Sequence, residues 1–331
     1  MKLHKDINAF ITLLDDIHNK TGYRSDVLEK DYYVVLLLEE LANKQKEGLL
    51  AYFKGGTALY KALHTTNRFS EDIDLSVDTR GCSRTQSDKR LENATKKYSN
   101  LNRDVSLGTT NRSEITSIYI YNPITNFERD DALQRFGKVK IEATSFTISE
   151  PVMNLEIVPL LYELATIEQK KILSNVYDVR PFEIKTITVE RIFVDKLFAA
   201  ESYVRKADVK NKAFEAAKHI YDLTIMAKLP NIIKLINEEE LLNTILTIRL
   251  KEELDRLDGV PRLLPHDFIF FDNIKNNKLV ISAYETMQSQ YVLRECDRVN
   301  YDDVIKEINN IKNILANNNV WCNACIPGID D

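Results

Sequence analysis

The sequence predicts an α+β protein, with a mixed α/β domain over residues 1–187 and a mostly α-helical domain over residues 188–331. The first domain contains runs in which apolar and polar residues alternate and β-branched side chains are frequent. This is the pattern of β-strands. Apolar residues at helical spacing dominate the second. The length of 331 residues is itself typical of about two domains.

The first domain opens with two predicted helices, at residues 6–20 and 25–46. The apolar positions of the second helix cover so broad an arc that we expect it to be largely buried. Strands are predicted at 51–54, 72–77, 115–121, 138–146 and 182–188, and further helices at 57–64 and 87–98. The segment 72–77 reads DIDLSV, where acidic and aliphatic residues alternate as on a strand with one buried face.

The second domain has predicted helices at 189–205, 211–227, 232–255 and 302–315. Residues 256–300 contain the turn-rich stretch LDGVPRLLPHD and give no helix prediction. No linker rich in Pro, Gly or Ser marks the boundary, so we expect the two domains to pack closely. The asparagines at 317–319 predict the end of the ordered chain.

The composition is that of an ordinary globular protein, with 44% hydrophobic and 29% charged residues. A net charge of −5 argues against a protein that coats nucleic acid with a wholly basic surface, but it leaves room for a local basic groove. No apolar run reaches the roughly 18 residues of a membrane span. The start, MKLHKDINAF, lacks the layout of a signal peptide, so we expect a cytosolic, cytoplasmic protein.

The chain has four cysteines, of which Cys322 and Cys325 form a C-x-x-C pair. A zinc site needs about four ligands, and no second pair accompanies this one. Two ordinary thiols are therefore the favoured interpretation, with a redox pair or half of an intermolecular site as the alternatives.

Gly55 and Gly56 stand between a predicted strand and the helix that Thr57 is expected to cap. Glycine lets a ligand approach the backbone closely, and the helix start offers unpaired N–H groups and a positive dipole end. Both suit a triphosphate. A tight strand-to-helix turn that needs glycine only for its geometry is the alternative, and the glycines alone do not decide between the two.

Asp72 and Asp74 are the stronger signal, because residues two apart on a strand point to the same face. Two adjacent carboxylates repel each other unless a cation lies between them, and Mg²⁺ prefers carboxylate and phosphate oxygens. An exposed acidic face of an edge strand is the alternative. The glycine turn and helix that precede the aspartates favour a magnesium site.

A third carboxylate is expected from a neighbouring strand. In KVKIEATS, Glu142 shares the polar face of its strand, so it is our first choice, with Glu156 of NLEIVPL as its rival. Arg68 and Ser70 lie in the approach to the aspartates. Arg68 is suited to pairing with Asp72 or to binding phosphate, and an ordinary solvated loop arginine is the alternative.

Residues 55–75, GGTALYKALHTTNRFSEDIDL, resemble the signature of the AbiEii-type nucleotidyltransferase toxins. These form a branch of the polymerase-β-like nucleotidyltransferase superfamily. Three further segments resemble family motifs and occur in the family's order: EKDYYVVLLLEEL at 29–41, DKLFAAESYVRK at 195–206 and KHIYDLTIM at 218–226.

The resemblance implies a polymerase-β-like nucleotidyltransferase domain followed by a helical domain, bilobed with a cleft between them. It implies transfer of a nucleotide from an NTP with two Mg²⁺ ions. It also implies a toxin of a toxin–antitoxin or phage-defence (abortive infection) system. The partner would be a winged-helix antitoxin encoded by a neighbouring gene, which need not contact the toxin, and tRNA is a candidate acceptor.

By the same resemblance, Gly55, Gly56 and Thr57 hold the phosphates, Lys196 reaches the triphosphate, and Asp222 is the last acidic residue of the site. The residues alone leave open whether Lys196 enters a cleft or extends out of the core. Where the family often has R-D-x-Y-D, this chain has His219 in place of the first acid, which leaves His219 with no expected role beyond packing.

The leading hypothesis is therefore a Mg²⁺-dependent nucleotidyltransferase toxin. Its predicted catalytic residues are Asp72, Asp74, Glu142, Lys196 and Asp222. The predicted metal ligands are Asp72, Asp74 and Glu142, and the predicted NTP-binding residues are Gly55, Gly56, Thr57, Arg68 and Ser70. The alternatives are an enzyme that modifies a small molecule or protein, as antibiotic adenylyltransferases do, and a nucleotide-binding module without turnover.

Overall fold

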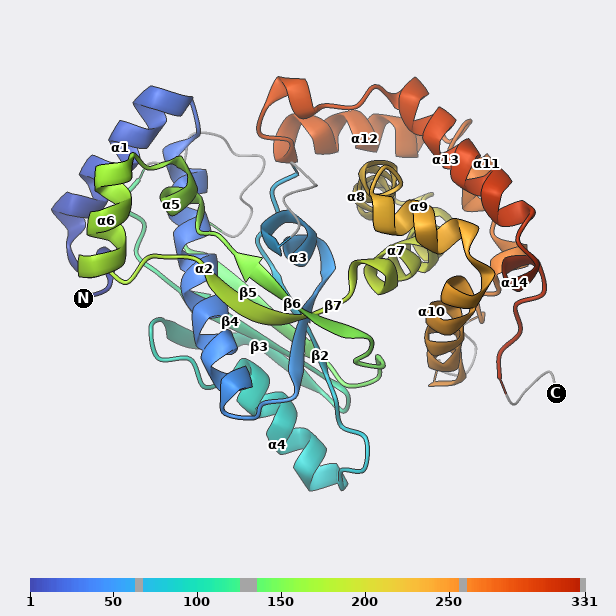
Figure 1. Cartoon of the computed structure of the whole chain (residues 1–331), viewed down its shortest axis with the longest axis horizontal. Coiled ribbons are helices and arrows are strands. Elements are labelled where there is room, and N and C mark those ends of the chain that lie inside the picture. Colours follow the sequence, from blue (N-terminus) through green and yellow to red (C-terminus); the bar gives the residue numbers. More distant parts are fainter. Residues whose placement is uncertain (63–67, 126–135, 256–260, 328–331) are drawn as a thin grey trace. The chain divides into compact units, whose positions relative to one another are not determined.

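The computed structural model describes residues 1–62, 68–125, 136–255 and 261–327 (Figure 1). The chain divides into two compact units. The sheet unit comprises Met1–His64, Ser70–Ser145 and Val152–Thr186, and the helical unit comprises Thr65–Phe69, Phe146–Pro151 and Ile187–Asp331. The expected mixed α/β first part and mostly helical second part are confirmed. Whether each folds as an independent domain, divided at 187/188, stays a prediction.

The sheet unit is built on one mixed sheet of seven strands in the order β3-β4-β5-β2-β1-β7-β6. β1 pairs antiparallel with β2 and parallel with β7, while β5 pairs parallel with β2 and antiparallel with β4. The strands are β1 (Ala51–Lys54), β2 (Ile73–Val77), β3 (Asn102–Asn111), β4 (Glu114–Ile120), β5 (Lys138–Thr144), β6 (Val152–Ile157) and β7 (Phe182–Ile187).

The register of the central strands separates an apolar face from a polar one. Phe53, Leu75, Ala143 and Ile115 lie side by side across four strands and are all buried. Alternation along each strand puts the next residues on the other face. There the row reads Lys54, Asp74, Glu142 and Thr116, each only partly buried.

Helices α2 and α4 cover the apolar face (Figure 1). Tyr33 of α2 stacks on Tyr121 with 3.9 Å between the ring centroids. Tyr119, on the apolar face of β4, donates a hydrogen bond from its hydroxyl to the backbone oxygen of Thr95 in α4. The helices of this unit are η1 (Leu3–Lys5), α1 (Ile7–Thr21), α2 (Ser25–Lys46), α3 (Gly55–Ala62), α4 (Arg84–Thr95), α5 (Leu160–Leu164) and α6 (Ile167–Val176).

Helix α2 buries three consecutive charged residues, Glu29, Lys30 and Asp31, which we call the α2 charge row. Lys30 Nζ lies 3.2 Å from a carboxylate oxygen of Glu71, just before β2, and donates a hydrogen bond to the backbone oxygen of Lys138, at the start of β5. The charge row thus fixes the two strands that carry the predicted carboxylates.

The outer residues of the α2 charge row bind other segments. Asp31 forms a buried ion pair with Lys61 of α3 and accepts a hydrogen bond from the backbone N–H of Leu160, at the start of α5. Glu29 accepts hydrogen bonds from the backbone N–H groups of Ile124 and Thr125. Helix α2 is therefore the element to which the segments of the sheet unit are attached by charge.

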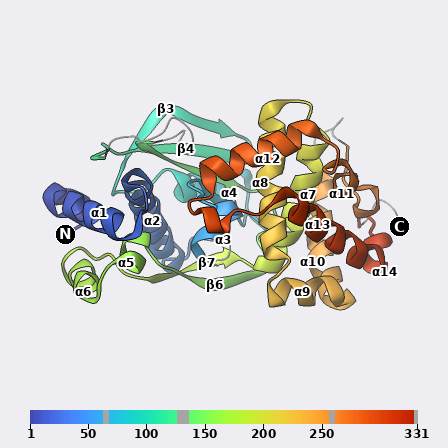
Figure 2. The same ribbon diagram turned by 90° about the horizontal axis from the view of Figure 1, so that it is seen from above.

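The helical unit is arranged around α8, which packs against α7 and α12 along its length and also against α13 (Figure 2). Its elements are α7 (Val189–Val204), α8 (Lys210–Met226), α9 (Pro230–Asn237), α10 (Glu239–Lys251), η2 (Glu252–Asp255), η3 (Pro265–Asp267), α11 (Phe270–Asn273), α12 (Lys278–Tyr291), η4 (Glu295–Asp297), α13 (Tyr301–Ala316) and α14 (Asn319–Cys322). None of the helices in the described parts of the chain combines the length and the apolar character that crossing a membrane requires.

The predicted helices and strands agree with the structure within a few residues, with three differences. Helix α3 begins at Gly55, so Thr57 lies inside its first turn instead of capping it. The helix expected at 232–255 is two helices and a 3₁₀ turn. Strands β3 and β6 and helices α5, α6, α11 and α12 had no counterpart in the prediction. Residues 63 and 64 of the predicted third helix lie outside the described part.

The expectation that order ends at residues 317–319 was wrong. Asn318 accepts hydrogen bonds from the backbone N–H groups of Val320 and Trp321 and so begins a further short helix, α14. Trp321 is buried, with its ring 5.4 Å from that of Phe268. The asparagine run therefore caps a helix that returns to the core. Cys322 and Cys325 are exposed free thiols.

The buried pair of Asp31 and Lys61 gives a stability prediction. Asp31→Asn keeps an acceptor for Leu160 N–H but leaves the Lys61 ammonium buried without a counter-charge, so we expect a loss of about 3–5 kcal/mol in the free energy of unfolding. The double variant Asp31→Asn/Lys61→Met should recover most of that loss, because it removes both charges. Urea unfolding followed by circular dichroism measures all three proteins.

A matched control is Lys20→Met, which breaks the exposed pair with Asp16, where 52% of the Lys20 side chain is accessible. We expect it to cost less than about 1 kcal/mol. If the double variant were as unstable as Asp31→Asn, the loss of stability in Asp31→Asn would not come from the unpaired ammonium of Lys61.

Candidate active site

The predicted carboxylates lie together on the polar face of the sheet. Asp74 of β2 and Glu142 of β5 are direct neighbours in the parallel register, and Asp72 immediately precedes β2 on the same face. The rival Glu156 lies on β6, the strand at the far edge of the sheet beyond β1 and β7. Glu142 is thus the carboxylate that the fold places beside the paired aspartates.

A lysine of the same face joins these carboxylates. Lys140 Nζ lies 3.1 Å from Asp72 Oδ2 and 3.0 Å from Glu142 Oε2. The three side chains are between 21% and 32% exposed, so solvent reaches the group. The ammonium offsets the repulsion that two such carboxylates would otherwise exert on each other.

Gly55 allows the close approach of Asp74 to the start of α3. A Cβ atom built on Gly55 would lie 2.4 Å from Asp74 Oδ2, and the glycine has a φ of +81°. Both observations require glycine at this position. The carboxylate of Asp74 is therefore packed against the helix start that was predicted to hold phosphate, where the helix dipole favours negative charge.

Thr57 and Ser70 connect the glycine turn to the approach to β2. The buried hydroxyl of Thr57 donates a hydrogen bond to Ser70 Oγ over 2.9 Å. Gly56 lies in the first turn of α3 and is partly exposed. The structure thus brings Gly55, Gly56, Thr57 and Ser70 to one place, next to Asp74.

Lys54 also lies on the polar face of the sheet beside Asp74, and it was not among the predicted site residues. It is paired in register with Asp74 and donates a hydrogen bond to Thr144 Oγ1 over 3.1 Å. The signal for it was present, because a lysine that ends a short strand just before a glycine pair shares the face of the site. We call Lys54, Asp72, Asp74, Lys140 and Glu142 the carboxylate cluster.

The carboxylate cluster has the chemistry of a magnesium site. Its acidic members offer the hard oxygen ligands that Mg²⁺ prefers, and Lys140 shows that the position between Asp72 and Glu142 attracts a cation. In the arrangement seen, no three His, Cys, Asp or Glu side chains among the described residues are grouped closely enough to hold a metal. The residues fit the ion chemically, with Lys140 as the group that it would displace.

A second polar cluster lies in the helical unit, around Asp222 of α8. Arg68 Nε and Nη2 donate hydrogen bonds to its two carboxylate oxygens, over 3.1 and 2.9 Å. Lys196 Nζ of α7 lies 2.6 Å from Asp222 Oδ2. All three side chains are buried. Burial alone would raise the pKa of Asp222, but Arg68 and Lys196 outweigh it and hold the pKa below its usual range.

This pairing bears on two sequence predictions. Arg68 was expected to pair with Asp72 or to reach phosphate, and its observed partner is Asp222. Lys196 was expected to reach the triphosphate, and it too binds Asp222. We call Arg68, Lys196 and Asp222 the α8 cluster, and its membership in the active site stays a prediction.

His219 lies one turn before Asp222 on α8. Its ring stacks on Tyr203 with 5.4 Å between centroids, and its Nδ1 is buried with no hydrogen-bond partner among the described residues. Burial lowers the pKa of His219 well below 6.5, and the cations of Lys196, Arg68 and Lys218 lower it further, against the opposing effect of Asp222. These contacts are those of a packing residue that stays neutral.

The family model of the nucleotidyl transferase AbiEii toxin of type IV toxin–antitoxin systems matches residues 36–297. This match spans most of the chain and includes both clusters. The chain belongs to the AbiEii family. It is a nucleotidyltransferase, and the family implies an NTP substrate and an antitoxin as partner.

The solved structures that the chain resembles include two from Helicobacter pylori. JHP933 is 17% identical over 89% of this chain and 98% of its own, with a TM-score of 0.35. A protein to which nucleotidyltransferase activity has been ascribed is 16% identical over 88% of this chain and 97% of its own, with a TM-score of 0.36. The search of curated proteins found no match.

The buried His219 gives a prediction for acid stability. Its pKa is lower in the folded chain than the value of about 6.5 in the unfolded chain, so its contribution to stability is complete above pH 6.5 and is lost as the pH falls below it. Between pH 7.5 and 5.5 the AbiEii family protein should lose about 1.4 kcal/mol in the free energy of unfolding through this residue.

The variant His219→Phe keeps the stacking ring and removes the titration. It should therefore lose about 1.4 kcal/mol less than the wild-type protein over the same pH range, as measured by urea unfolding at both pH values. An equal loss in the two proteins would mean that other groups cause the acid sensitivity.

Proposed function

We propose that this AbiEii toxin transfers a nucleotide from an NTP to tRNA in a Mg²⁺-dependent reaction, with the carboxylate cluster as its catalytic centre. The supporting observation is that Asp74 and Glu142 are neighbours in the sheet and that Asp74 packs against Gly55, where a Cβ atom would collide with its carboxylate. Carboxylates that share one face of a sheet beside a helix start suit phosphoryl chemistry, where positioning and charge stabilisation supply most of the rate.

In this proposal Asp72, Asp74 and Glu142 hold the metal ions. Bound Mg²⁺ would supply charge neutralisation on the phosphates and would make the acceptor hydroxyl easier to deprotonate. Lys140 and Lys54 place positive charge on the same face and would attract the triphosphate. Gly55, Gly56 and Thr57, at the start of α3, present backbone N–H groups, and Ser70 holds Thr57 in place.

The α8 cluster enters the proposal through the family resemblance of its two segments. Its two cations share one carboxylate, so Arg68 and Lys196 together carry more positive charge than Asp222 neutralises. Such a surplus suits the β- and γ-phosphates of an NTP. Whether the α8 cluster acts in the same reaction is tested by Lys196→Met, which should weaken NTP use if it does.

The proposed biological role is growth arrest by blocking translation, since an acceptor tRNA that carries an added nucleotide cannot be charged. We propose that the antitoxin implied by the family is a winged-helix repressor encoded by a neighbouring gene. It would oppose the effect of the toxin without needing to bind it.

The first prediction of this proposal concerns the aspartates. Asp72→Asn and Asp74→Asn should each lower the transfer of label from an α-labelled NTP into total tRNA by at least about 100-fold, because each removes a charge that stabilises the reaction. Induction of the wild-type protein should arrest growth, and induction of Asp74→Asn should not.

Asp88→Asn on α4 is the matched control, since Asp88 is exposed and lies on another element. It should transfer like the wild-type protein. Label that enters a protein or an aminoglycoside instead of RNA would reassign the acceptor. NTP binding without release of pyrophosphate, whatever the acceptor, would contradict the enzyme proposal.

The second prediction concerns Lys140. Because its ammonium lies between Asp72 and Glu142, it competes with a metal for the same oxygens, so Lys140→Met should bind Mn²⁺, a spectroscopic substitute for Mg²⁺, about tenfold or more tightly. Electron paramagnetic resonance of free Mn²⁺ measures this without any turnover. Lys138→Met, two residues away on the same strand face, should bind Mn²⁺ like the wild-type protein. Unchanged or weaker binding by Lys140→Met would exclude competition.

A further inference from the structure

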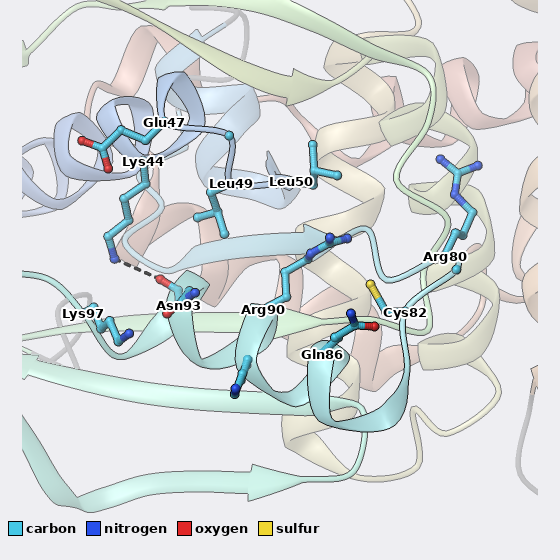
Figure 3. A pocket seen from close by; sticks show the side chains of 13 residues that line it. Lys44, Glu47, Leu49, Leu50, Arg80, Cys82, Gln86, Arg90, Asn93 and Lys97 are labelled. Carbon is cyan, nitrogen blue, oxygen red and sulfur yellow. Dashed lines mark hydrogen bonds between the residues drawn. The ribbon is translucent and has the colours of Figure 1, made fainter.

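A second, basic site lies in the sheet unit, in a pocket of about 830 Å³. It is formed by the end of α2, the turn into β1, the loop after β2 and one face of α4 (Figure 3). Five of the side chains that line it are cationic and one is acidic; the cations are Lys44, Arg80, Lys89, Arg90 and Lys97, and the acid is Glu47. In a chain with a net charge of −5, this is a strong local excess of positive charge.

One face of α4 supplies much of this lining. Gln86, the adjacent pair Lys89 and Arg90, then Asn93 and Lys97 recur every three or four residues along α4 and just past its end, so they form a continuous stripe. From residue 86 to residue 97 a helical path covers about 16 Å. The donors are therefore spread along a line and do not converge on one point.

Two of the cations are available to a ligand. Lys89 and Lys97 are exposed and form no hydrogen bond or ion pair with any residue in the described parts of the chain. Arg90 is partly buried and donates a hydrogen bond to the backbone oxygen of Asp78, which holds its guanidinium at the pocket wall. The pocket thus contains one cation that is held in place by the protein, Arg90, and two lysines that are available to bind a ligand.

Lys44 is held within the pocket by α4. Its Nζ donates a hydrogen bond to the backbone oxygen of Asn93 over 3.0 Å (Figure 3). The same Nζ lies 3.7 Å from the centre of the Tyr98 ring. Burial, together with the charge of Lys97, lowers the pKa of Lys44 to about 8, although Glu40 and Glu47 oppose the shift. An anion in the pocket would offset the cost of keeping this ammonium charged.

The pocket is separate from the carboxylate cluster. Asp72 and Asp74 lie at the start of β2, whereas Arg80 and Cys82 follow its end. Likewise Gly55 follows the end of β1, whereas Leu49 and Leu50 precede its start. From residue 72 to residue 78 an extended strand covers about 20 Å. A ligand that reaches both places must be long.

We propose that this basic pocket binds the phosphodiester backbone of the RNA acceptor, away from the reacting end. The inference rests on the proposed function for the identity of the RNA. A stripe of cations about 16 Å long matches several successive phosphates, whereas a single phosphate or an NTP would need donors that converge. Because the contacts are to phosphates, the pocket adds affinity and orientation without reading the base sequence.

The test is the binding of fluorescently labelled total tRNA to the full chain, followed by anisotropy without NTP. Lys89→Glu/Lys97→Glu should raise the Kd by about tenfold or more at low salt. The slope of log Kd against log salt should fall by about 1.5 to 2, because two phosphate contacts are lost. Lys275→Glu/Lys278→Glu, with the same charge change at two exposed lysines of the helical unit, should bind like the wild-type protein.

Three outcomes would overturn the inference: unchanged binding by Lys89→Glu/Lys97→Glu, an equal loss in the control variant, or displacement of tRNA by ATP or inorganic phosphate at equal phosphate concentration. Duplex DNA that binds equally well would overturn the assignment to RNA.

A failure of the proposed function would give a different result from a failure of the pocket proposal. If the pocket binds tRNA but the proposed reaction does not occur, Asp74→Asn and the wild-type protein would both bind tRNA, and neither would transfer a nucleotide. If both proposals hold, Lys89→Glu/Lys97→Glu should raise KM for tRNA and leave kcat and NTP binding unchanged.

Discussion

The sheet unit depends on the burial of three consecutive charges in one helix. Glu29, Lys30 and Asp31 have no access to solvent, and each must therefore find a partner inside the protein. Lys30 and Asp31 find theirs in the segments that build the carboxylate cluster: the approach to β2, the start of β5 and the helix that follows the glycines. Glu29 binds the backbone N–H groups of Ile124 and Thr125. An apolar helix would pack against the same sheet, but it would hold these segments by van der Waals contacts alone, and those allow small displacements of a segment. Buried ion pairs allow much smaller displacements, because a partner that moves away leaves an uncompensated buried ion.

The α2 charge row also explains the form of the motif EKDYYVVLLLEEL. The residues from 32 to 38, which follow the charges, are buried and apolar or aromatic and cover the sheet, and the charges act at the end of the helix nearest to the carboxylate cluster. The parallel pairing of β2 with β5 then completes the site by register alone. Asp74 meets Glu142 because Ile73 meets Ile141, and a shift by one residue would bury the carboxylates and expose the isoleucines.

The parts of the fold and of the candidate site that could be predicted from the sequence are those in which the alternation within one strand decides where a side chain lies. Alternation in DIDLSV and KVKIEATS placed Asp74 and Glu142 on one face, and the register shows them adjacent.

Strand β3 was missed because nearly all of its residues are exposed, so no alternation marks it. Helix α12 was missed because turn-rich sequence precedes it. The pairing of Arg68 and Lys196 with Asp222, and that of Lys140 with Asp72, could not be predicted, since each joins segments that only tertiary packing brings together. Trp321 is buried by the same kind of long-range contact.

The contact between Gly55 and Asp74 has a genetic consequence. Every missense change of a glycine codon adds at least a Cβ, and here that atom would lie 2.4 Å from the carboxylate on a backbone that other residues rarely adopt. Asp74 would have to turn away or the turn would have to move, whichever amino acid is introduced. If the carboxylate cluster is the catalytic centre as proposed, we expect any missense change at this codon to lower the toxin's activity, while the remaining fold, including the basic pocket at the other end of β2, is left in place.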